Sequence, residues 1–299
     1  MKLEELITKA TQLTSKVVAI AAAEDEEVIE AVSHALDKQL ASFILFGHEE
    51  KIMALLKEHH VEASHPALKI VTADGAKKAS ELAVKAVSSG EADVLMKGNV
   101  PTATILKEVL NKEYGLRTGN VLSHVAAFEV PGYEQLIFVT DAAMNVAPDL
   151  QQKVQIVQNS VHVARALGIE LPKVAPLAAV EVVNPAMQAT VDAALLTQMN
   201  NRGQIKDCII DGPLALDNAV SALAAEHKGI QSEVAGQADI LFVPTIEAGN
   251  VLYKSLIYFA KAKVGAIIAG AKAPIVLTSR ADSAESKLNS LALAVCSVK

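Results

Sequence analysis

The chain has 299 residues, 51% of them hydrophobic, and its 34 acidic side chains outnumber its 27 basic ones to give a formal net charge of −7. This apolar content excludes a disordered chain, and the negative charge, with six Phe, four Tyr and no Trp, disfavours a nucleic-acid-binding protein. At roughly 150 residues per domain, the length predicts two domains.

The cysteines and the apolar runs bear on where the protein works. Cys208 and Cys296 lie far apart in the sequence, so they form neither a disulfide framework nor a Cys-x-x-Cys metal motif. Residues 1–16 contain no signal-peptide core, and the longest apolar run, 264–277, is shorter than the roughly 20 residues of a membrane-spanning helix. We therefore expect a cytoplasmic protein.

Short apolar runs that end in polar, Gly or Pro residues recur along the chain, and amphipathic stretches follow most of them. This alternation predicts strands and helices of a parallel α/β sheet. The predicted strands are 17–21, 42–46, 68–71, 92–96, 135–140, 173–183, 208–210, 240–243 and 275–278.

The polar loop 145–148 precedes a long predicted helix, 149–167, and marks the expected change of domain. We expect the chain to return to the first domain near Pro274. The prediction is therefore one α/β domain of residues 1–145 and 274–299 and a second of residues 146–273. A last helix, 283–295, is expected to lie beside an early element, because chain ends are often close together.

Ligands of open parallel sheets bind outside the carboxyl ends of the strands. The polar residues that follow the predicted strands are therefore candidate site residues. They are Lys97, Asn99, Asp141, Asn145, Asp211, Asp217, Glu247, Asn250, Ser279 and Arg280.

The turn 97–102 has the sequence Lys-Gly-Asn-Val-Pro-Thr. Pro101 suits the first turn of a helix, and Gly98 lets backbone N–H groups approach an anion there, which favours phosphate binding by Lys97, Gly98 and Asn99. The equal alternative is a tight turn in which Asn99 caps the helix.

Ser279 and Arg280 directly follow the strand predicted to end at 278. A guanidinium there can clamp a phosphate while the hydroxyl donates a hydrogen bond to a developing oxyanion. The alternative is a helix entry, capped either by Asp282 with Glu285 or by Ser283, which lies three residues before Ser286. We assign Asp282 and Glu285 mainly to capping that helix and Arg280 mainly to function.

Two further pairs of candidates follow other strands. Asp141 and Asn145 lie in the loop after 135–140, and Glu247 and Asn250 flank Gly249, which lets a ligand approach the backbone closely. For the second pair, a turn that caps a helix is the equal alternative.

Several common site motifs are absent from the sequence. It contains no G-x-G-x-x-G, G-x-x-x-x-G-K-[ST] or G-x-S-x-G pattern, which are typical of dinucleotide, Walker and α/β-hydrolase sites. The histidines at 59, 60 and 65 have no matching acidic or cysteine set, so we predict no metal site.

A set of longer motifs resembles the phosphate acetyl/butyryltransferase family, most closely its phosphate butyryltransferase branch. The motifs are MKGNVPTA (96–103), VTDAAMN (139–145), DGPLALD (211–217), AGQAD (235–239), GNVLYK (249–254) and LTSRADS (277–283). The resemblance implies a two-domain subunit like that of the isocitrate and isopropylmalate dehydrogenases, a homodimer, and an active site in the cleft between the domains. It also implies exchange of CoA and phosphate on a short acyl group, with no cofactor beyond CoA and no metal.

The resemblance also implies roles for particular residues. Ser279 and Arg280 match a Ser-Arg pair that acts at the acyl and phosphate groups of the related acetyltransferases. Lys107 matches an arginine of the related acetyltransferases. That arginine lies near the start of a helix and contacts an anion. The family's proposed base is an aspartate six residues after Arg280, where this chain has Ser286, so the adjacent Glu285 is the base candidate here.

Three alternatives remain open at this point. Acetyl-CoA rather than a four-carbon acyl-CoA is the nearest one. A metal-dependent hydroxyacid dehydrogenase of the same fold, with Asp141, Asp211 and Asp217 as ligands, is the second. A non-catalytic CoA-binding protein is the third, which the serine at position 286 keeps open.

Overall fold

The computed structural model describes residues 1–13, 16–279 and 282–298, and the contacts among them divide the chain into two domains. Residues 2–120 and 264–299 form one, which we call the terminal domain. Met1 and residues 121–263 form the other, the central domain. The sequence placed the boundaries later, at 145/146 and 273/274; they fall earlier because strands at 123–140 and 263–269 pair within the central and the terminal sheet, respectively.

The terminal domain contains a sheet with the strand order β3-β2-β1-β4-β11-β10. Neighbouring strands are parallel except β10 and β11, which are antiparallel. Its elements are α1 (Leu3–Thr11), β1 (Val17–Ala21), α2 (Glu26–Asp37), β2 (Ser42–Gly47), α3 (Glu49–Glu58), β3 (Leu68–Thr72), α4 (Gly75–Ser88), β4 (Val94–Lys97), α5 (Thr102–Val109), β10 (Lys263–Ala269), β11 (Ile275–Val276) and α11 (Ala284–Cys296).

The central domain has the strand order β5-β6-β9-β7-β8, with an antiparallel β5–β6 pair and parallel pairs elsewhere. The expected parallel α/β fold is confirmed in both domains. The elements are β5 (Ser123–Glu129), β6 (Ile137–Thr140), α6 (Leu150–Ala166), β7 (Lys173–Pro176), α7 (Gln188–Asn201), β8 (Ile209–Ile210), α8 (Leu216–Val220), α9 (Ala222–His227), β9 (Ile240–Phe242) and α10 (Ile246–Tyr258).

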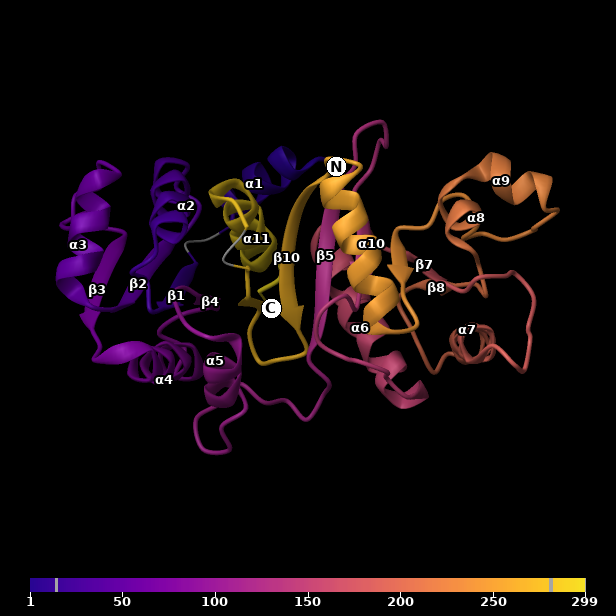
Figure 1. Ribbon diagram of the computed structural model, residues 1–299, viewed down its shortest axis with the longest axis horizontal. Helices are drawn as coiled ribbons and strands as arrows, with labels where there is room; N and C mark the ends of the chain where they lie inside the picture. The colour runs from indigo at the N-terminus through magenta and orange to yellow at the C-terminus, as the bar shows by residue number, and fades with distance from the viewer. Residues whose placement is uncertain (14–15, 280–281, 299) are drawn as a thin grey trace. The chain divides into compact units, whose positions relative to one another are not determined.

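Helices cover both faces of each sheet (Figure 1). In the terminal domain α2 and α3 lie on the opposite side of the strands from α4 and α5, and in the central domain α6 and α7 lie opposite α8, α9 and α10. This double cover explains why the inner strands are apolar on both faces: Val18–Ala21 of β1 are fully buried.

Helix α11 is the most deeply buried helix of the terminal domain. Every residue from Lys287 to Cys296 is buried, and most of these residues are apolar. It packs against α1 and α2, which confirms that the chain's last helix lies beside an early element (Figure 1). Gly265 of β10 allows this approach, since a Cβ there would lie 2.8 Å from the backbone of Asn289.

No helix among the residues that the structure describes is long and apolar enough to cross a membrane.

Candidate active site

The parallel register of the terminal sheet gathers several candidates at one edge. Ala21 of β1 is the partner of Lys97 in β4, and Met96 of β4 is the partner of Val276 in β11. The segments that leave these three strands therefore emerge at the same edge, from which α2, α5 and α11 begin. Lys97, Asn99 and Ser279 are brought together there, beside helix N-termini that favour anions.

The turn after β4 is held by backbone hydrogen bonds. The N–H groups of Gly98 and Asn99 donate to the carbonyls of Ala21 and Ala22, at 2.9 and 2.6 Å. A Cβ at Gly98 would lie 2.1 Å from the Ala22 oxygen, so glycine is required for this close packing. The contacts therefore favour the tight turn over a phosphate cradle built from these two N–H groups.

The polar side chains of this turn differ in their surroundings. Lys97 is 6% exposed, and its ammonium donates to the Gly98 carbonyl oxygen at 3.2 Å. Asn99 is exposed and does not cap α5, whose N-cap is Pro101. The expected helix cap at Asn99 is therefore wrong, and its amide instead lies 3.5 Å from the carbonyl oxygen of Glu24.

Lys107 does not lie where the resemblance implied. It is exposed and belongs to the last turn of α5. The rise of about 1.5 Å per residue separates Lys107 from the N-terminal turn, and its expected contact with an anion stays a prediction.

Two hydrogen bonds join Ser279, which follows β11, to Asp282, which precedes α11. The Asp282 carboxylate accepts from the Ser279 N–H at 2.7 Å, and the Asp282 N–H donates to the Ser279 carbonyl at 3.2 Å. Ser283 caps α11, with its hydroxyl oxygen accepting from the Ser286 N–H at 3.2 Å. The expected capping of this helix thus falls mainly to Ser283, while Asp282 shapes the segment that carries the exposed Ser279.

Arg280 lies outside the described residues, so its role stays a prediction. Glu285 is exposed in the first turn of α11, at the edge where Ser279 emerges. Its role as the base also stays a prediction. Ser286 occupies the position where the resemblance implies an aspartate. Its backbone N–H donates to the Ser283 hydroxyl oxygen, which caps the helix.

The corresponding edge of the central domain is organised by Asp141, which is 3% exposed. One carboxylate oxygen accepts from the N–H groups of Ala143 and Met144, both at 2.9 Å. The other accepts from the N–H and the side-chain amide of Asn145, at 3.1 and 2.6 Å. A carboxylate has about four acceptor positions, so Asp141 is fully used in folding its own loop.

The start of α10 packs directly on this loop. A Cβ at Gly249 would lie 2.6 Å from the Asp141 carbonyl oxygen, so glycine permits the approach of the helix rather than of a ligand. The interpretation of Gly249 as a ligand-approach position is therefore wrong. Glu247 and Asn250 remain exposed in the first turns of α10, at the same edge as Asp141 and Asn145.

The three aspartates considered as metal ligands do not form a cluster. Asp141 is saturated by its own loop, and Asp217 lies 3.2 Å from the ammonium of Lys228. Among the residues described, no group of three or more His, Cys, Asp and Glu side chains is placed to hold a metal ion. The geometry gives no support to the dehydrogenase alternative.

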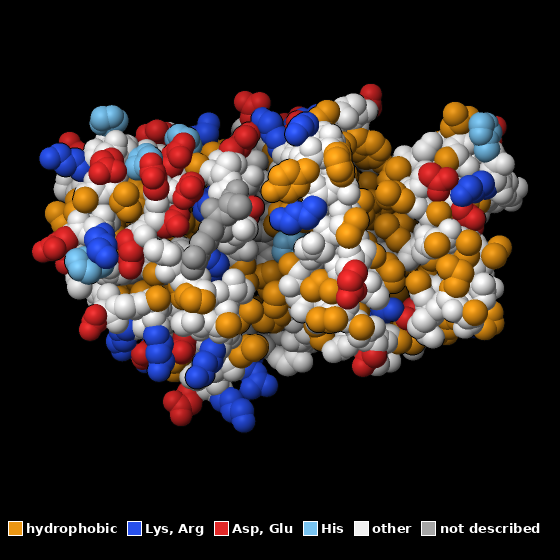
Figure 2. Space-filling model, in the orientation of Figure 1, with side chains coloured by type: hydrophobic (Ala, Val, Ile, Leu, Met, Phe, Trp, Pro, Cys, Tyr) orange, Lys and Arg blue, Asp and Glu red, His pale blue; other side chains and the backbone are white. Residues whose placement is uncertain are grey.

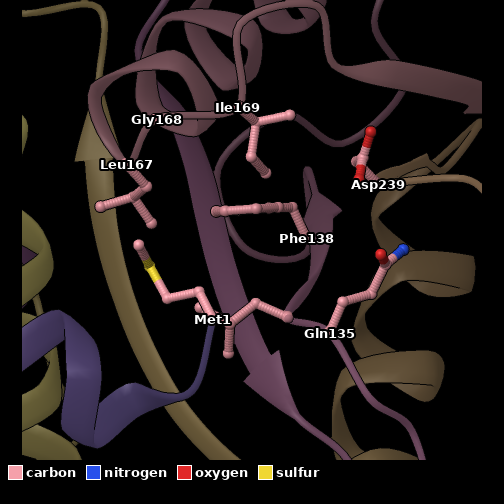
Figure 3. A pocket seen from close by; sticks show the side chains of 8 residues that line it. Met1, Gln135, Phe138, Leu167, Gly168, Ile169 and Asp239 are labelled. Carbon is pink, nitrogen blue, oxygen red and sulfur yellow. The ribbon is translucent and has the colours of Figure 1, made fainter.

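A cavity of about 340 Å³ in the central domain lies away from these residues. It sits at the amino ends of β6 and β9, the opposite edge from Asp141, and Figure 3 shows Gln135 and Asp239 on one side of it with apolar side chains on the other. Burial raises the pKa of Asp239, whose carboxylate accepts from the Lys173 N–H at 2.8 Å. The cavity contains none of the predicted site residues.

The chain is similar to known proteins over nearly its whole length. The family model for phosphate acetyl/butaryl transferase matches residues 2–82 and 71–295. The chain belongs to this family. It is 60% identical over 299 residues to a probable phosphate butyryltransferase of Bacillus subtilis, covering 99% of this chain and 98% of that protein. It is 53% identical to the phosphate butyryltransferase of Clostridium beijerinckii, covering 97% and 96% of the two chains.

A solved structure of the same kind supports the fold. The crystal structure of a branched-chain phosphotransacylase from Enterococcus faecalis V583 superposes with a TM-score of 0.83 and 39% identity, covering 95% of this chain and 99% of that one. The family resemblance drawn from the sequence motifs is therefore confirmed.

One buried residue near Ser279 and Asp282 was not among the candidates drawn from the sequence. Lys287 is 2% exposed, and its ammonium donates to the Asp282 carbonyl oxygen at 2.5 Å. The signal was present in the sequence, because a single lysine opens the otherwise uncharged stretch 287–296 of a helix that the structure buries.

Proposed function

We propose that the protein transfers a short acyl group between CoA and phosphate, with butyryl-CoA or a branched-chain acyl-CoA as the acyl donor. Family membership and similarity to proteins named phosphate butyryltransferase and branched-chain phosphotransacylase support this reaction. The structural observation that carries it is the position of Ser279. Its backbone is fixed by Asp282 at the edge where Lys97 and the N-terminus of α11 also lie.

The reaction depends mainly on positioning the two substrates and stabilising negative charge, because a thioester and an acyl phosphate are both activated acyl donors. A phosphate oxygen attacks the thioester carbonyl carbon and forms a tetrahedral oxyanion. The C–S bond then breaks, an acyl phosphate forms, and the CoA sulfur leaves as a thiolate that takes up the proton released from phosphate.

Each candidate residue takes a definite part in this scheme. The Arg280 guanidinium binds phosphate in a bidentate manner, and the Ser279 hydroxyl donates to the oxyanion. Lys97 adds positive charge at the same edge, and Glu285 carries the proton between phosphate and sulfur. Asn99 and Lys107 are exposed and are left to substrate contacts outside the reacting atoms.

The residues of the central domain contribute on the substrate side. Asp141 and Asn145 give the loop after β6 a fixed shape, while Glu247 and Asn250 present exposed polar groups beside it. An acyl site shared by both domains stays a prediction. No step of the scheme requires a metal or a cofactor beyond the substrate CoA.

Acetyl-CoA is the alternative donor, because the family model covers acetyl as well as butyryl transfer. One additional methylene in a hydrophobic pocket discriminates by only about 1 to 3 kcal/mol, so a quantitative comparison of donors is required.

We propose further that the active form is a homodimer in the cytoplasm. Helix α10 has Gly249 as its one buried residue among those described, and it leaves Val251, Tyr258 and the adjacent Phe259 65%, 62% and 87% exposed. Apolar side chains are visible along this helix (Figure 2). An exposed apolar stripe of this kind suits a self-complementary contact with a second copy. Both cysteines are free thiols, which fits a reducing compartment.

The oligomeric state has a direct test. Sedimentation of the wild type is expected to show a dimer and that of Phe259→Glu a shift toward monomer. A monomeric wild type would contradict the dimer, and an unchanged dimer in Phe259→Glu would place the contact elsewhere than α10.

The donor is tested by release of free CoA thiol from acetyl-, butyryl- and isobutyryl-CoA, with and without phosphate, in buffer containing a chelator. The proposal predicts phosphate-dependent release that is fastest with the four-carbon donors. Fastest release from acetyl-CoA would move the assignment to the acetyl branch. Tight CoA binding without release from any donor would favour the non-catalytic alternative.

A further inference from the structure

The terminal domain buries the charged ammonium of Lys287, and hydrophobic packing does not account for a buried charge. The residue is 2% exposed and is followed in α11 by buried, uncharged residues up to Cys296. A charge removed from water costs several kcal/mol unless other groups compensate it. The only acceptor of this ammonium among the described residues is the Asp282 carbonyl oxygen, at 2.5 Å.

That acceptor belongs to the segment that carries Ser279. From the Lys287 ammonium the contacts run to the Asp282 carbonyl, and from the Asp282 carboxylate to the Ser279 N–H at 2.7 Å. A second bond, from the Asp282 N–H to the Ser279 carbonyl, joins the same two residues. Lys287 is therefore linked to the backbone of Ser279 through one intermediate residue, and it is anchored in a rigid, buried helix.

We propose that Lys287 is a positioning residue for acyl transfer, holding Asp282 so that the Ser279 hydroxyl is fixed where the oxyanion develops. The inference rests on the proposed function. A lysine suits this task because its long stem crosses the buried face of α11 while its ammonium still donates at the loop. A methionine of similar length fills the same space and donates nothing, which leaves the Asp282 carbonyl without this partner.

The first arm of the test needs no turnover. Amide hydrogen exchange of residues 277–283 is compared in the wild type, Lys287→Met and Asn289→Ala. Asn289 is the matched control, because it is 3% exposed in the same helix but its amide faces the Val264 carbonyl of β10. We expect faster exchange of the loop in Lys287→Met alone. Equal exchange in Lys287→Met and the wild type would overturn the proposal.

The second arm measures kcat and the KM for phosphate and acyl-CoA in the same proteins and in Lys287→Arg. We expect Lys287→Met to lower kcat about 100-fold, the scale for a misplaced or lost oxyanion donor. The KM for acyl-CoA should change less than about threefold, since uniform binding is unaffected. Lys287→Arg, which keeps a donor, should recover at least a tenth of wild-type kcat.

These arms separate the possible failures. If the wild type releases no CoA, the proposed function fails, while the exchange arm still decides whether Lys287 holds the loop. If Lys287→Met and Asn289→Ala lose kcat equally, the role of Lys287 is only structural and the proposal is overturned. Should Lys287→Met fail to fold, Asp282→Ala removes the other end of the same linkage and is read in the same way.

Discussion

Lys153 and Asp192 form a buried ion pair in the central domain, with the ammonium nitrogen and a carboxylate oxygen 2.5 Å apart. The pair joins the first turn of α6 to the second turn of α7, and the amide of Gln188 donates to the second carboxylate oxygen at 2.9 Å. Both helices begin near the edge that carries Asp141. The pair therefore joins the N-terminal parts of two helices that begin near Asp141.

Breaking this pair on one side should be costly. Asp192→Asn leaves the Lys153 ammonium buried without a counter-charge, and we expect the free energy of unfolding to fall by about 3 to 5 kcal/mol. Urea denaturation measures this difference. The double variant Lys153→Met, Asp192→Leu should recover most of the loss, because it removes both charges. Exposed ion pairs contribute only about 0 to 1 kcal/mol. If the free energy of unfolding of Asp192→Asn lay within about 1 kcal/mol of the wild-type value, the pair would not be buried as described.

The Asp141 carboxylate should prove structural rather than chemical. Asp141→Asn replaces one acceptor oxygen by a donor that faces N–H groups, so we expect a loss of about 2 to 3 kcal/mol in unfolding free energy. The folded fraction should keep kcat within about tenfold of the wild type. Thermal unfolding and CoA release measured on the same sample test both parts. A stable variant with abolished turnover would instead place Asp141 at the reacting atoms.

Substitutions of Arg280 and of Ser279 are expected to change different kinetic parameters. Arg280→Ala should reduce kcat/KM for phosphate at least about 100-fold, with Arg280→Lys intermediate because the point charge loses bidentate contact. Ser279→Ala should lower kcat by about 10² to 10³ with little change in the KM for phosphate. Steady-state kinetics with phosphate varied distinguishes them. A wild-type kcat/KM for phosphate in Arg280→Ala would remove Arg280 from the phosphate site.

The buried thiols give the protein a defined response to alkaline pH. Burial raises the pKa of the Cys208 thiol from 9.0 to about 12. The unfolded thiol therefore ionises first, and the stability present below pH 9 is lost as the pH rises toward 12. For this group the loss is about 1.4 kcal/mol per pH unit.

Cys208→Ala tests this directly. Its unfolding free energy, measured by urea denaturation across that range, should fall less steeply with pH than that of the wild type. Cys296, whose pKa burial raises to about 11, remains as the second such thiol in the variant. Identical slopes in the two proteins would contradict the assignment to Cys208.

The strand and helix pattern predicted most of the fold, and its omissions have one cause. Strands β5 and β10 were missed because each leads into an antiparallel partner, β6 and β11, rather than into a helix. The strand-then-helix pattern cannot mark such strands. The predicted domain boundaries differ from those of the structure because β5 and β6 belong to the central domain and β10 to the terminal one.

The placement of the candidate residues at one edge could be predicted from topology, whereas the hydrogen bonds of their side chains could not. Ser279, Lys97 and Asn99 share an edge because parallel strands end there, which the sequence indicates. The saturation of Asp141 and the link from Lys287 to Ser279 depend on how loops fold, and no spacing in the sequence encodes that. The expected anion contact of Lys107 stays a prediction, and the structure places this residue in the last turn of α5.

Transfer of the acyl group from CoA to phosphate can be observed directly. Phosphorus-31 NMR of the protein with butyryl-CoA and inorganic phosphate tests it by detecting the acyl phosphate itself, alongside a thiol assay of the CoA released. We expect butyryl phosphate and free CoA in equal amounts, and neither product when phosphate is left out. Free butyrate in place of butyryl phosphate, or CoA release that does not depend on phosphate, would contradict it.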